Sequence, residues 1–201
     1  MPIVNVEGLI LAAGFSRRMG FPKLEVEIDG MPLLERVVRA ALESTLCCVV
    51  VVQGPQSPRL FPNPRWSGSE RKLKVVVNPE PERGMSSSMR IGLGHVNRAS
   101  DGVMILLGDQ PRITGALIDE LVATFGQDPG RIVYPTIKSR RTTPAVLPRP
   151  LFAEMETVRG DKGAREVIQR HPELVRAVEM GDRYDDRDID SPDDLSALVR
   201  R

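Results

Sequence analysis

Continuous apolar runs recur along the chain, and each is short enough to form one buried strand. They predict strands at Val6–Ala12, Leu46–Gln53, Leu73–Val77, Gly102–Leu107, Arg131–Tyr134 and Ala145–Leu147. Between these runs, apolar residues repeat every three or four positions, which is the spacing of amphipathic helices. That spacing predicts helices over Met31–Glu43 and Met85–Val96, and further helices that begin after N-caps at Thr114 and Ser191.

This alternation predicts an α/β fold built on one mainly parallel sheet. Parallel sheets need helices on both faces, so we expect a single Rossmann-like domain of three layers spanning residues 1–201. A chain of 201 residues is long enough to bury a substantial core. Gly54–Arg71 is rich in proline, serine, arginine and glycine, which predicts a long surface loop.

The composition argues against several classes of function. The formal net charge is +1 and aromatic residues make up 4% of the chain, so no nucleic-acid partner is expected. No apolar stretch approaches transmembrane length and no signal peptide is recognisable, so no membrane partner is expected. Adjacent residues on a strand face opposite sides, which disfavours a disulfide between Cys47 and Cys48. We expect both to be buried thiols of a cytoplasmic protein.

The loop that follows the first predicted strand carries the densest chemistry. Gly14 and Gly20 allow close approach of backbone N–H groups, while Arg17, Arg18 and Lys23 supply the positive charge that a polyphosphate needs. The loop is not a P-loop, because five residues separate the glycines and no Lys-Ser or Lys-Thr follows. The residues indicate binding of nucleotide phosphates, with an ordinary solvated turn as the alternative.

Carboxylates form a second candidate cluster. Asp109 directly follows a predicted strand, at the end where α/β sheets bind ligands. Its carboxylate can ligate Mg²⁺, or it can cap the turn into Pro111. Near the end of the chain, Asp188 and Asp190 flank Ile189, so an extended backbone would place both carboxylates on one face.

Polar side chains also gather where the chain enters the predicted helix Met85–Val96. Asn78, Gly84, Ser86 and Ser87 precede or open this helix. Their hydroxyls and backbone amides can bind a base edge or a sugar, whereas the simpler interpretation is helix capping by Ser86 or Ser87.

A further charged segment surrounds Gly163. This glycine opens a predicted helix whose N-terminus would attract an anion, and Lys162 and Arg165 add positive charge. The alternative is a plain helix start with Asp161 as its N-cap and solvated basic side chains.

The early loop resembles the signature of a known enzyme family. Leu11-Ala12-Ala13-Gly14-Phe15-Ser16-Arg17-Arg18-Met19-Gly20, followed by Lys23, is similar to the nucleotidyltransferases of the MobA-like type, and most similar to the molybdenum-cofactor cytidylyltransferases. Guanylyltransferase relatives carry Gly-Gly where this chain has Ala12-Ala13. Asp-Ile-Asp-Ser-Pro at 188–192 resembles the family's late metal-binding motif, and 160–165 resembles its acceptor-side motif. The chain departs from the family at Thr142-Thr143-Pro144, where Gly-His-Pro is common.

The resemblance implies an enzyme that transfers the cytidylyl group of CTP to molybdopterin and releases pyrophosphate. Its implied catalytic residues are Lys23, Arg18 and Asp109, with Mg²⁺ as cofactor held by Asp109 and Asp190. The implied nucleotide-binding residues are Leu11, Ala12, Ala13, Gly14, Ser16, Arg18, Lys23, Asn78, Gly84, Ser86 and Ser87. The implied acceptor-binding residues are Asp161, Lys162, Gly163 and Arg165. The product would pass through a transient contact to a molybdenum oxidoreductase.

Three alternatives stay open at this point. Two change only the substrates: guanylyl transfer to molybdopterin, and cytidylyl or uridylyl transfer to a sugar or polyol phosphate. The third is a non-catalytic carrier of finished molybdenum cofactor. A carrier would not need Lys23 together with Asp109 and Asp190, so the presence of all three favours an enzyme.

Overall fold

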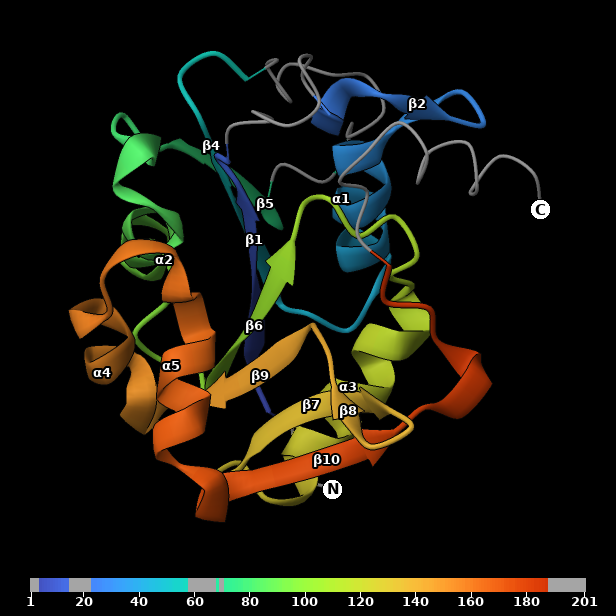
Figure 1. The fold of residues 1–201 in the computed structure, drawn as a ribbon, viewed down its shortest axis with the longest axis vertical. Coiled ribbons are helices and arrows are strands. Elements are labelled where there is room, and N and C mark those ends of the chain that lie inside the picture. The colour runs from blue at the N-terminus through green and yellow to red at the C-terminus, as the bar shows by residue number, and fades with distance from the viewer. Residues whose placement is uncertain (1–3, 15–22, 58–67, 69–70, 188–201) are drawn as a thin grey trace.

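The computed structural model of the protein describes residues 4–14, 23–57, 68 and 71–187. Its central sheet has the strand order β10-β7-β9-β6-β1-β4-β5, with β8 paired to β7 (Figure 1). The strands are β1 Val6–Ala12, β4 Cys48–Gln53, β5 Leu73–Val77, β6 Gly102–Leu107, β7 Ile132–Ile137, β8 Arg140–Arg141, β9 Ala145–Pro148 and β10 Val175–Glu179. A separate antiparallel pair joins β2 Glu27–Ile28 to β3 Met31–Pro32.

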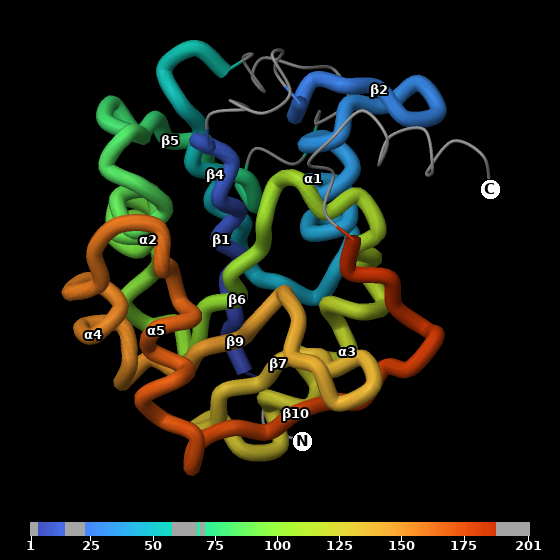
Figure 2. Tube along the Cα trace, viewed as in Figure 1, coloured from blue at the N-terminus to red at the C-terminus, as the bar shows by residue number. Residues whose placement is uncertain are grey.

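The sheet is mainly parallel, as predicted. The β1–β4, β1–β6, β4–β5 and β7–β10 pairs are parallel, whereas β9 runs antiparallel to both β6 and β7. Figure 2 shows how the chain returns through β9 between two strands that precede it in sequence. The expected α/β class with a doubly covered sheet is therefore confirmed.

Two groups of helices complete the three layers. They are α1 Leu33–Glu43, α2 Met85–Leu93, α3 Gly115–Gln127, α4 Phe152–Thr157 and α5 Gly163–Arg170. Figure 1 shows α1 and α3 on one face of the sheet and α2, α4 and α5 on the other. We call these the α1/α3 face and the α2/α5 face.

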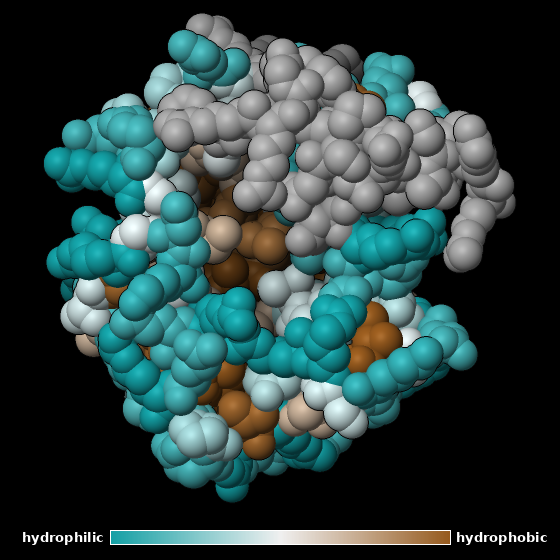
Figure 3. Space-filling model, viewed as in Figure 1, coloured by the Kyte–Doolittle hydropathy of each residue, from teal (hydrophilic) through white to brown (hydrophobic). Residues whose placement is uncertain are grey.

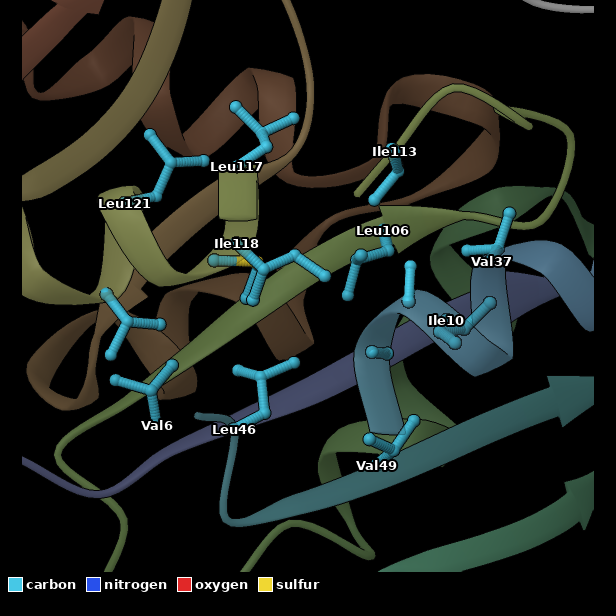
Figure 4. Close-up of a cluster of buried hydrophobic side chains, with 14 of the residues drawn as sticks. Val6, Ile10, Val37, Leu46, Val49, Leu106, Ile113, Leu117, Ile118 and Leu121 are labelled. Atoms are coloured by element: carbon cyan, nitrogen blue, oxygen red, sulfur yellow. The ribbon is translucent and has the colours of Figure 1, made fainter. Parts of the chain in front are cut away.

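Each face of the sheet buries its own hydrophobic cluster. Alternate β1 residues divide between them, with Ile10 in the cluster on the α1/α3 face and Leu9 in the cluster on the α2/α5 face. Figure 4 shows the first cluster, in which Ile118 of α3 and Leu106 of β6 are fully buried. Burial of side chains of this size is worth roughly 1.5–3 kcal/mol each, so the two clusters fix the sheet between its helices.

Three strands have the predicted bounds, and the predicted helices differ from the observed ones for local reasons. β1, β5 and β6 have the predicted bounds. The first helix begins at Leu33 because Met31–Pro32 pairs with β2 instead. α2 ends at Leu93, before Gly94, which forms the C-cap. Cys48 is buried as expected, but the prediction that Cys47 is also buried is wrong, because Cys47 is exposed.

The N-cap predicted at Thr114 is confirmed. Its hydroxyl accepts a hydrogen bond from the Leu117 backbone N–H at 3.2 Å. The predicted C-terminal helix from Ser191 lies outside the described residues. Within the described ranges, no helix combines the length and apolar character needed to span a membrane.

Candidate active site

The ends of β1 and β6 meet at the carboxyl edge of the sheet. Leu11 is in register with Leu107, and the Gly108 N–H donates to the Leu11 carbonyl oxygen at 3.0 Å. A side chain at Gly108 would come within 3.2 Å of the Ala12 Cβ and 3.1 Å of the Leu34 Cδ1, so glycine permits this close approach. The loop after β6 is thereby held directly beside the loop after β1.

An ion pair links these two loops. Lys23 Nζ donates to Asp109 Oδ2 at 2.7 Å, and the two side chains are 16% and 22% exposed. Lys23 begins a short 3₁₀ turn that ends at Glu25, whereas Asp109 follows β6 and Gly108. The two predicted catalytic groups are therefore neighbours, although 86 positions separate them in the sequence.

The second oxygen of Asp109 is the unusual atom of the site. Asp109 Oδ1 is buried and has no hydrogen-bond partner in the described part of the chain. Buried carboxylate oxygens are normally satisfied, so this oxygen is available to a donor or a cation that the described residues do not supply. A hard divalent cation takes oxygen ligands of this kind.

Other predicted members of the site lie beyond what the structure describes. Ser16, Arg18 and Asp190 fall outside the described residues. In the described ranges, no group of three or more His, Cys, Asp or Glu side chains is arranged to hold a metal ion. Asp109 is the described residue that fits a metal ligand best.

The loop after Asp109 is anchored by a contact that the sequence did not indicate. Gln110 is 3% exposed, and its Oε1 accepts a hydrogen bond from the Thr143 hydroxyl at 2.7 Å. The Thr143 carbonyl oxygen in turn accepts from the Tyr184 hydroxyl at 2.9 Å. Thr143 is one of the positions at which the chain departs from the family's usual Gly-His-Pro. Here it ties the segment before β9 to the carboxylate loop.

The described start of the predicted nucleotide loop, Leu11 to Gly14, offers mainly backbone to a ligand. Leu11, Ala12 and Ala13 are buried, with the Ala12 methyl in the cluster on the α1/α3 face. Gly14 is exposed, and a Cβ there would meet no atom within 4 Å. The open backbone at Gly14 is what this part of the loop presents to a ligand.

The predicted base-binding serines form an internal network. Asn78 is 1% exposed, and its Nδ2 donates to the hydroxyls of Ser87 at 2.8 Å and Ser88 at 3.0 Å. The Ser87 hydroxyl donates to the Gly84 carbonyl oxygen at 2.8 Å. Ser86 is also buried. These side chains rigidify the connection from β5 to α2.

The cap of α2 comes from elsewhere in the chain. The Met85 backbone N–H donates to Asp161 Oδ1 at 3.2 Å. The expectation that Ser86 or Ser87 caps this helix is wrong, because neither side chain accepts a bond from the first turn. Asp161 is likewise not the N-cap of α5, where Lys162 takes that position without a side-chain bond.

Two glycines bring the predicted nucleotide and acceptor segments into contact. Gly84 has φ +89°, and a Cβ there would lie 2.6 Å from Asp161 Oδ1. Gly163 has φ +53°, and a Cβ there would lie 2.7 Å from the Met85 sulfur. Only glycine tolerates both the backbone conformation and the crowding. The start of α2 and the start of α5 are therefore packed together.

The remaining acceptor candidates lie on the surface of α5. Lys162 Nζ lies 3.5 Å from Glu166 Oε2. Arg165 is exposed in the first turn of the helix. Figure 3 shows the face of the molecule that Figure 1 presents. Apolar residues gather there in a hollow over the region of β1 and β6, and hydrophilic residues lie beside and below it.

An exposed carboxylate, Glu179 at the end of β10, holds the basic turn between β7 and β8. Glu179 accepts from the Thr136 hydroxyl at 2.8 Å and from the backbone N–H groups of Lys138, Ser139 and Gly181. These bonds, led by that of Thr136, lower the pKa of Glu179 to about 2. No local motif signals this contact, because Glu179 lies about 40 positions from the turn that it holds.

Comparison with known proteins places the chain in a family. The chain belongs to the family of MobA-like NTP transferase domains, whose family model matches residues 8–175. It is a member of a nucleotidyltransferase family, which agrees with the resemblance of the early loop.

Relatives with different names align with most of the chain. The purine catabolism protein PucB of Bacillus subtilis (strain 168) is 29% identical and the nicotine blue oxidoreductase of Paenarthrobacter nicotinovorans is 28% identical. These alignments cover 96% of this chain, and 95% and 96% of those proteins. A probable molybdenum cofactor guanylyltransferase of Natranaerobius thermophilus is 27% identical over 74% of this chain and 65% of its own length.

Solved structures share the fold. Rv0371c from Mycobacterium tuberculosis H37Rv superposes with a TM-score of 0.78 at 23% identity, covering 100% of both chains. The structure of that protein in complex with manganese superposes with a TM-score of 0.73 at 22% identity, covering 98% of this chain and 99% of that one.

Proposed function

We propose that this protein is a cytoplasmic, Mg²⁺-dependent cytidylyltransferase that transfers the cytidylyl group of CTP to the terminal phosphate of molybdopterin. The observation that carries the proposal is the ion pair of Lys23 and Asp109 at the joined ends of β1 and β6. A lysine and an aspartate side by side at the edge of the sheet where this architecture binds ligands support a phosphate-binding role for Lys23 and a metal-binding role for Asp109. A non-catalytic carrier would need neither group.

The residues present fit a divalent cation. The buried, unpartnered Oδ1 of Asp109 is a hard oxygen ligand, and Asp190 is the proposed second ligand. A bound Mg²⁺ would neutralise charge on the triphosphate and on the departing pyrophosphate. The manganese complex of the mycobacterial neighbour supports a divalent metal as the cofactor.

The proposed reaction needs alignment and charge neutralisation more than acid–base chemistry. An oxygen of the acceptor phosphate forms a bond to the α-phosphorus of CTP while the bond between that phosphorus and the bridging oxygen breaks. Pyrophosphate leaves with the electron pair. The acceptor phosphate is already ionised near neutral pH, so the chain need not supply a general base. Lys23 would stabilise charge around the α-phosphate, and Arg18 with the loop amides would hold the β- and γ-phosphates.

Substrate choice is assigned to three segments. Ala12-Ala13 supports cytidine over guanosine, although the buried Ala12 methyl would act through the shape of the loop rather than by touching the base. Asn78, Gly84, Ser86 and Ser87 are proposed to frame the nucleotide through the rigid start of α2. Asp161, Lys162, Gly163 and Arg165 are proposed to border the acceptor, with Asp161 acting through its cap on α2.

Guanylyl transfer to molybdopterin is the second candidate. The observation that favours it is the likeness to the probable molybdenum cofactor guanylyltransferase. The two candidates share the acceptor and the mechanism, and they differ only in the nucleobase. In either case the product is proposed to pass to a molybdenum oxidoreductase through a transient contact.

A substrate panel tests the proposal. CTP, GTP, ATP and UTP are each combined with molybdopterin or with common sugar phosphates, in the presence of Mg²⁺, Mn²⁺ or EDTA, and pyrophosphate release is measured. We expect release with CTP, molybdopterin and Mg²⁺, and none with EDTA. Release with GTP instead would establish the second candidate. Release with sugar phosphates alone would refute molybdopterin as acceptor, and no release with any pair would refute nucleotidyl transfer.

A further inference from the structure

Arg141 lies on the face of the sheet that the acceptor segment covers. It stands opposite Thr136 in the β7–β8 pair, so its side chain shares the α2/α5 face with Tyr134, two residues before Thr136. Its guanidinium carbon lies 5.9 Å from the centroid of the Tyr134 ring. Arg141 is half-buried, and Tyr134 packs against the cluster that contains Ala164 of α5. The guanidinium of Arg141 therefore lies near an aromatic ring that packs against the cluster to which α5 contributes.

A second arginine, Arg165, lies in the first turn of α5, next to Ala164 of this cluster. Burial, followed by the positive charge of Arg165, lowers the pKa of Arg141. Arg165 itself stands in the first turn of α5, where the helix dipole disfavours a cation. Two arginines thus repel each other beside a positive helix end, which is an arrangement that costs stability unless an anion joins it.

The protein supplies no such anion in the ranges that the structure describes. Neither Arg141 nor Arg165 forms an ion pair there, while neighbouring basic side chains do. Arg140 pairs with Asp186 at 2.8 Å, and Lys162 and Arg170 both pair with Glu166. Among the described residues, carboxylates therefore pair with the adjacent cations and not with Arg141 or Arg165.

The carboxylate that shares this face is engaged elsewhere. Glu179 stands opposite Thr136 on the other side of β7. Both of its oxygens accept hydrogen bonds from Thr136 and the surrounding backbone N–H groups. It holds the turn that leads into Arg141 and does not neutralise the guanidinium.

We propose that Arg141 and Arg165 together bind one phosphate group of the acceptor molecule, whose apolar or aromatic body rests over Tyr134. Guanidinium groups bind phosphate through paired N–H donors, and two of them suit a dianionic phosphomonoester. The position is right for an acceptor, because Arg141 is followed by Thr142 and Thr143, and Thr143 bonds to Gln110 beside Asp109. The inference rests on the proposed function and adds the chemistry by which its acceptor is recognised.

We call Arg141 and Arg165 together the phosphate clamp, and three matched variants test it in the enzyme assay. Arg141→Met and Arg165→Met remove the charge and keep an unbranched side chain, and Arg140→Met removes the neighbouring, exposed arginine as a control. We expect each of the first two to raise the acceptor KM by about tenfold or more, with the nucleotide KM unchanged. The double variant should lose less than the sum of the two single effects, because both arginines hold the same phosphate. Acceptor KM values that equal those of Arg140→Met would overturn the inference.

A binding measurement separates failure of the clamp from failure of the proposed function. Phenyl phosphate is titrated by calorimetry into the wild-type protein, into the same three variants and into Lys23→Met, which probes the nucleotide loop. We expect phenyl phosphate to bind the wild type and to bind about tenfold more weakly to Arg141→Met and Arg165→Met. Arg140→Met and Lys23→Met should bind like the wild type.

Each outcome of this titration decides the inference. No binding to the wild type, or loss of binding through Lys23→Met alone, would overturn the clamp whatever the enzyme assay shows. Binding that depends on Arg141 and Arg165, in a protein that releases no pyrophosphate with any substrate pair, would support the phosphate clamp and refute only nucleotidyl transfer.

Discussion

Lys23 Nζ lies 2.7 Å from Asp109 Oδ2, so a lysine that follows the β1 loop and a carboxylate that follows β6 form one ion pair. Each group neutralises the other in the structure described here. On arrival of a metal-bound nucleotide, the carboxylate would turn to the cation and the ammonium to the phosphates. In the proposed reaction, the pair would hold both groups close to the phosphates and the cation that each of them binds.

The first prediction concerns this pair. Asp109→Asn and Lys23→Met should each lower the turnover number by about 100–1000-fold, as removal of one preorganised charged group does elsewhere. The measurement is the initial rate of pyrophosphate release at saturating substrates, with circular dichroism to verify the fold. Glu43→Gln, which breaks the exposed Arg39–Glu43 pair on α1, serves as the control and should leave turnover unchanged. Turnover within threefold of wild type in both variants would remove the pair from the mechanism.

The second prediction concerns the hydrogen bond between Thr143 and the buried Gln110. Thr143→Val keeps the shape of the side chain but leaves the Gln110 oxygen without this donor, which should cost about 1–3 kcal/mol of unfolding free energy. Thr143→Ser keeps the hydroxyl and should lose much less. Urea unfolding measures stability, and the rate of pyrophosphate release reports whether the Asp109 loop has moved. Equal stability of the two variants would show that the bond does not hold the loop.

The third prediction separates two roles of Asp161. Asp161→Ala removes the oxygen that accepts from the Met85 N–H and should cost about 1 kcal/mol of stability. Asp161→Asn keeps a capping oxygen and should stay close to the wild type in urea unfolding. A higher acceptor KM in Asp161→Asn, at unchanged stability, would mean that the carboxylate also contacts the acceptor directly.

The fourth prediction concerns the ion pair of His171 and Glu154. Its Nε2 lies 2.6 Å from Glu154 Oε2, and that hydrogen bond is the main cause that raises the pKa of His171 above 6.5. The same bond, with a contribution from Arg170, lowers the pKa of Glu154 below 4.5. The histidine's contribution to stability is complete below pH 6.5 and is lost as the pH rises through its raised pKa. The glutamate's contribution is complete above pH 4.5 and is lost as the pH falls through its lowered pKa.

The unfolding free energies of wild type and His171→Gln should therefore differ most between pH 4.5 and pH 6.5. We expect the wild type to be more stable by about 0.2–1 kcal/mol near pH 5.5, and the difference to vanish near pH 9. His95→Gln, at an exposed position after α2, is the control. A difference that grows from pH 5.5 to pH 9 would contradict the assigned pKa direction.

Local patterns predicted β1, β4, β5, β6, β7, β9 and part of the site, but not β2, β3, β8 or β10. Continuous apolar runs predicted the bounds of β1, β5 and β6, and β1 and β6 are buried along nearly their whole length, as expected for strands covered on both faces. The rule that ligands bind at the carboxyl ends of parallel strands predicted that Asp109 would lie near the β1 loop. Both inferences use properties that are local in the chain or common to every parallel sheet.

Contacts between distant segments could not be predicted in the same way. One of the two interpretations of Asp161 made it a cap for the helix that follows it, yet it caps α2, 76 positions away. Arg141 was one of several basic residues in a turn, and nothing in the sequence distinguished it from Arg140. Its antiparallel register with β7 puts Arg141 on the face of Tyr134.

The sequence by itself determined the layers of this protein, the edge at which its chemistry gathers and the kind of residue found there. Tertiary structure alone decided which aspartate caps which helix, which threonine bonds to Gln110 and which arginine of the basic turn lies over the Tyr134 ring. The physical reason is that apolar periodicity reports burial within one segment. The choice among chemically equivalent polar partners depends instead on strand order, strand direction and register, which bring together residues far apart in the chain.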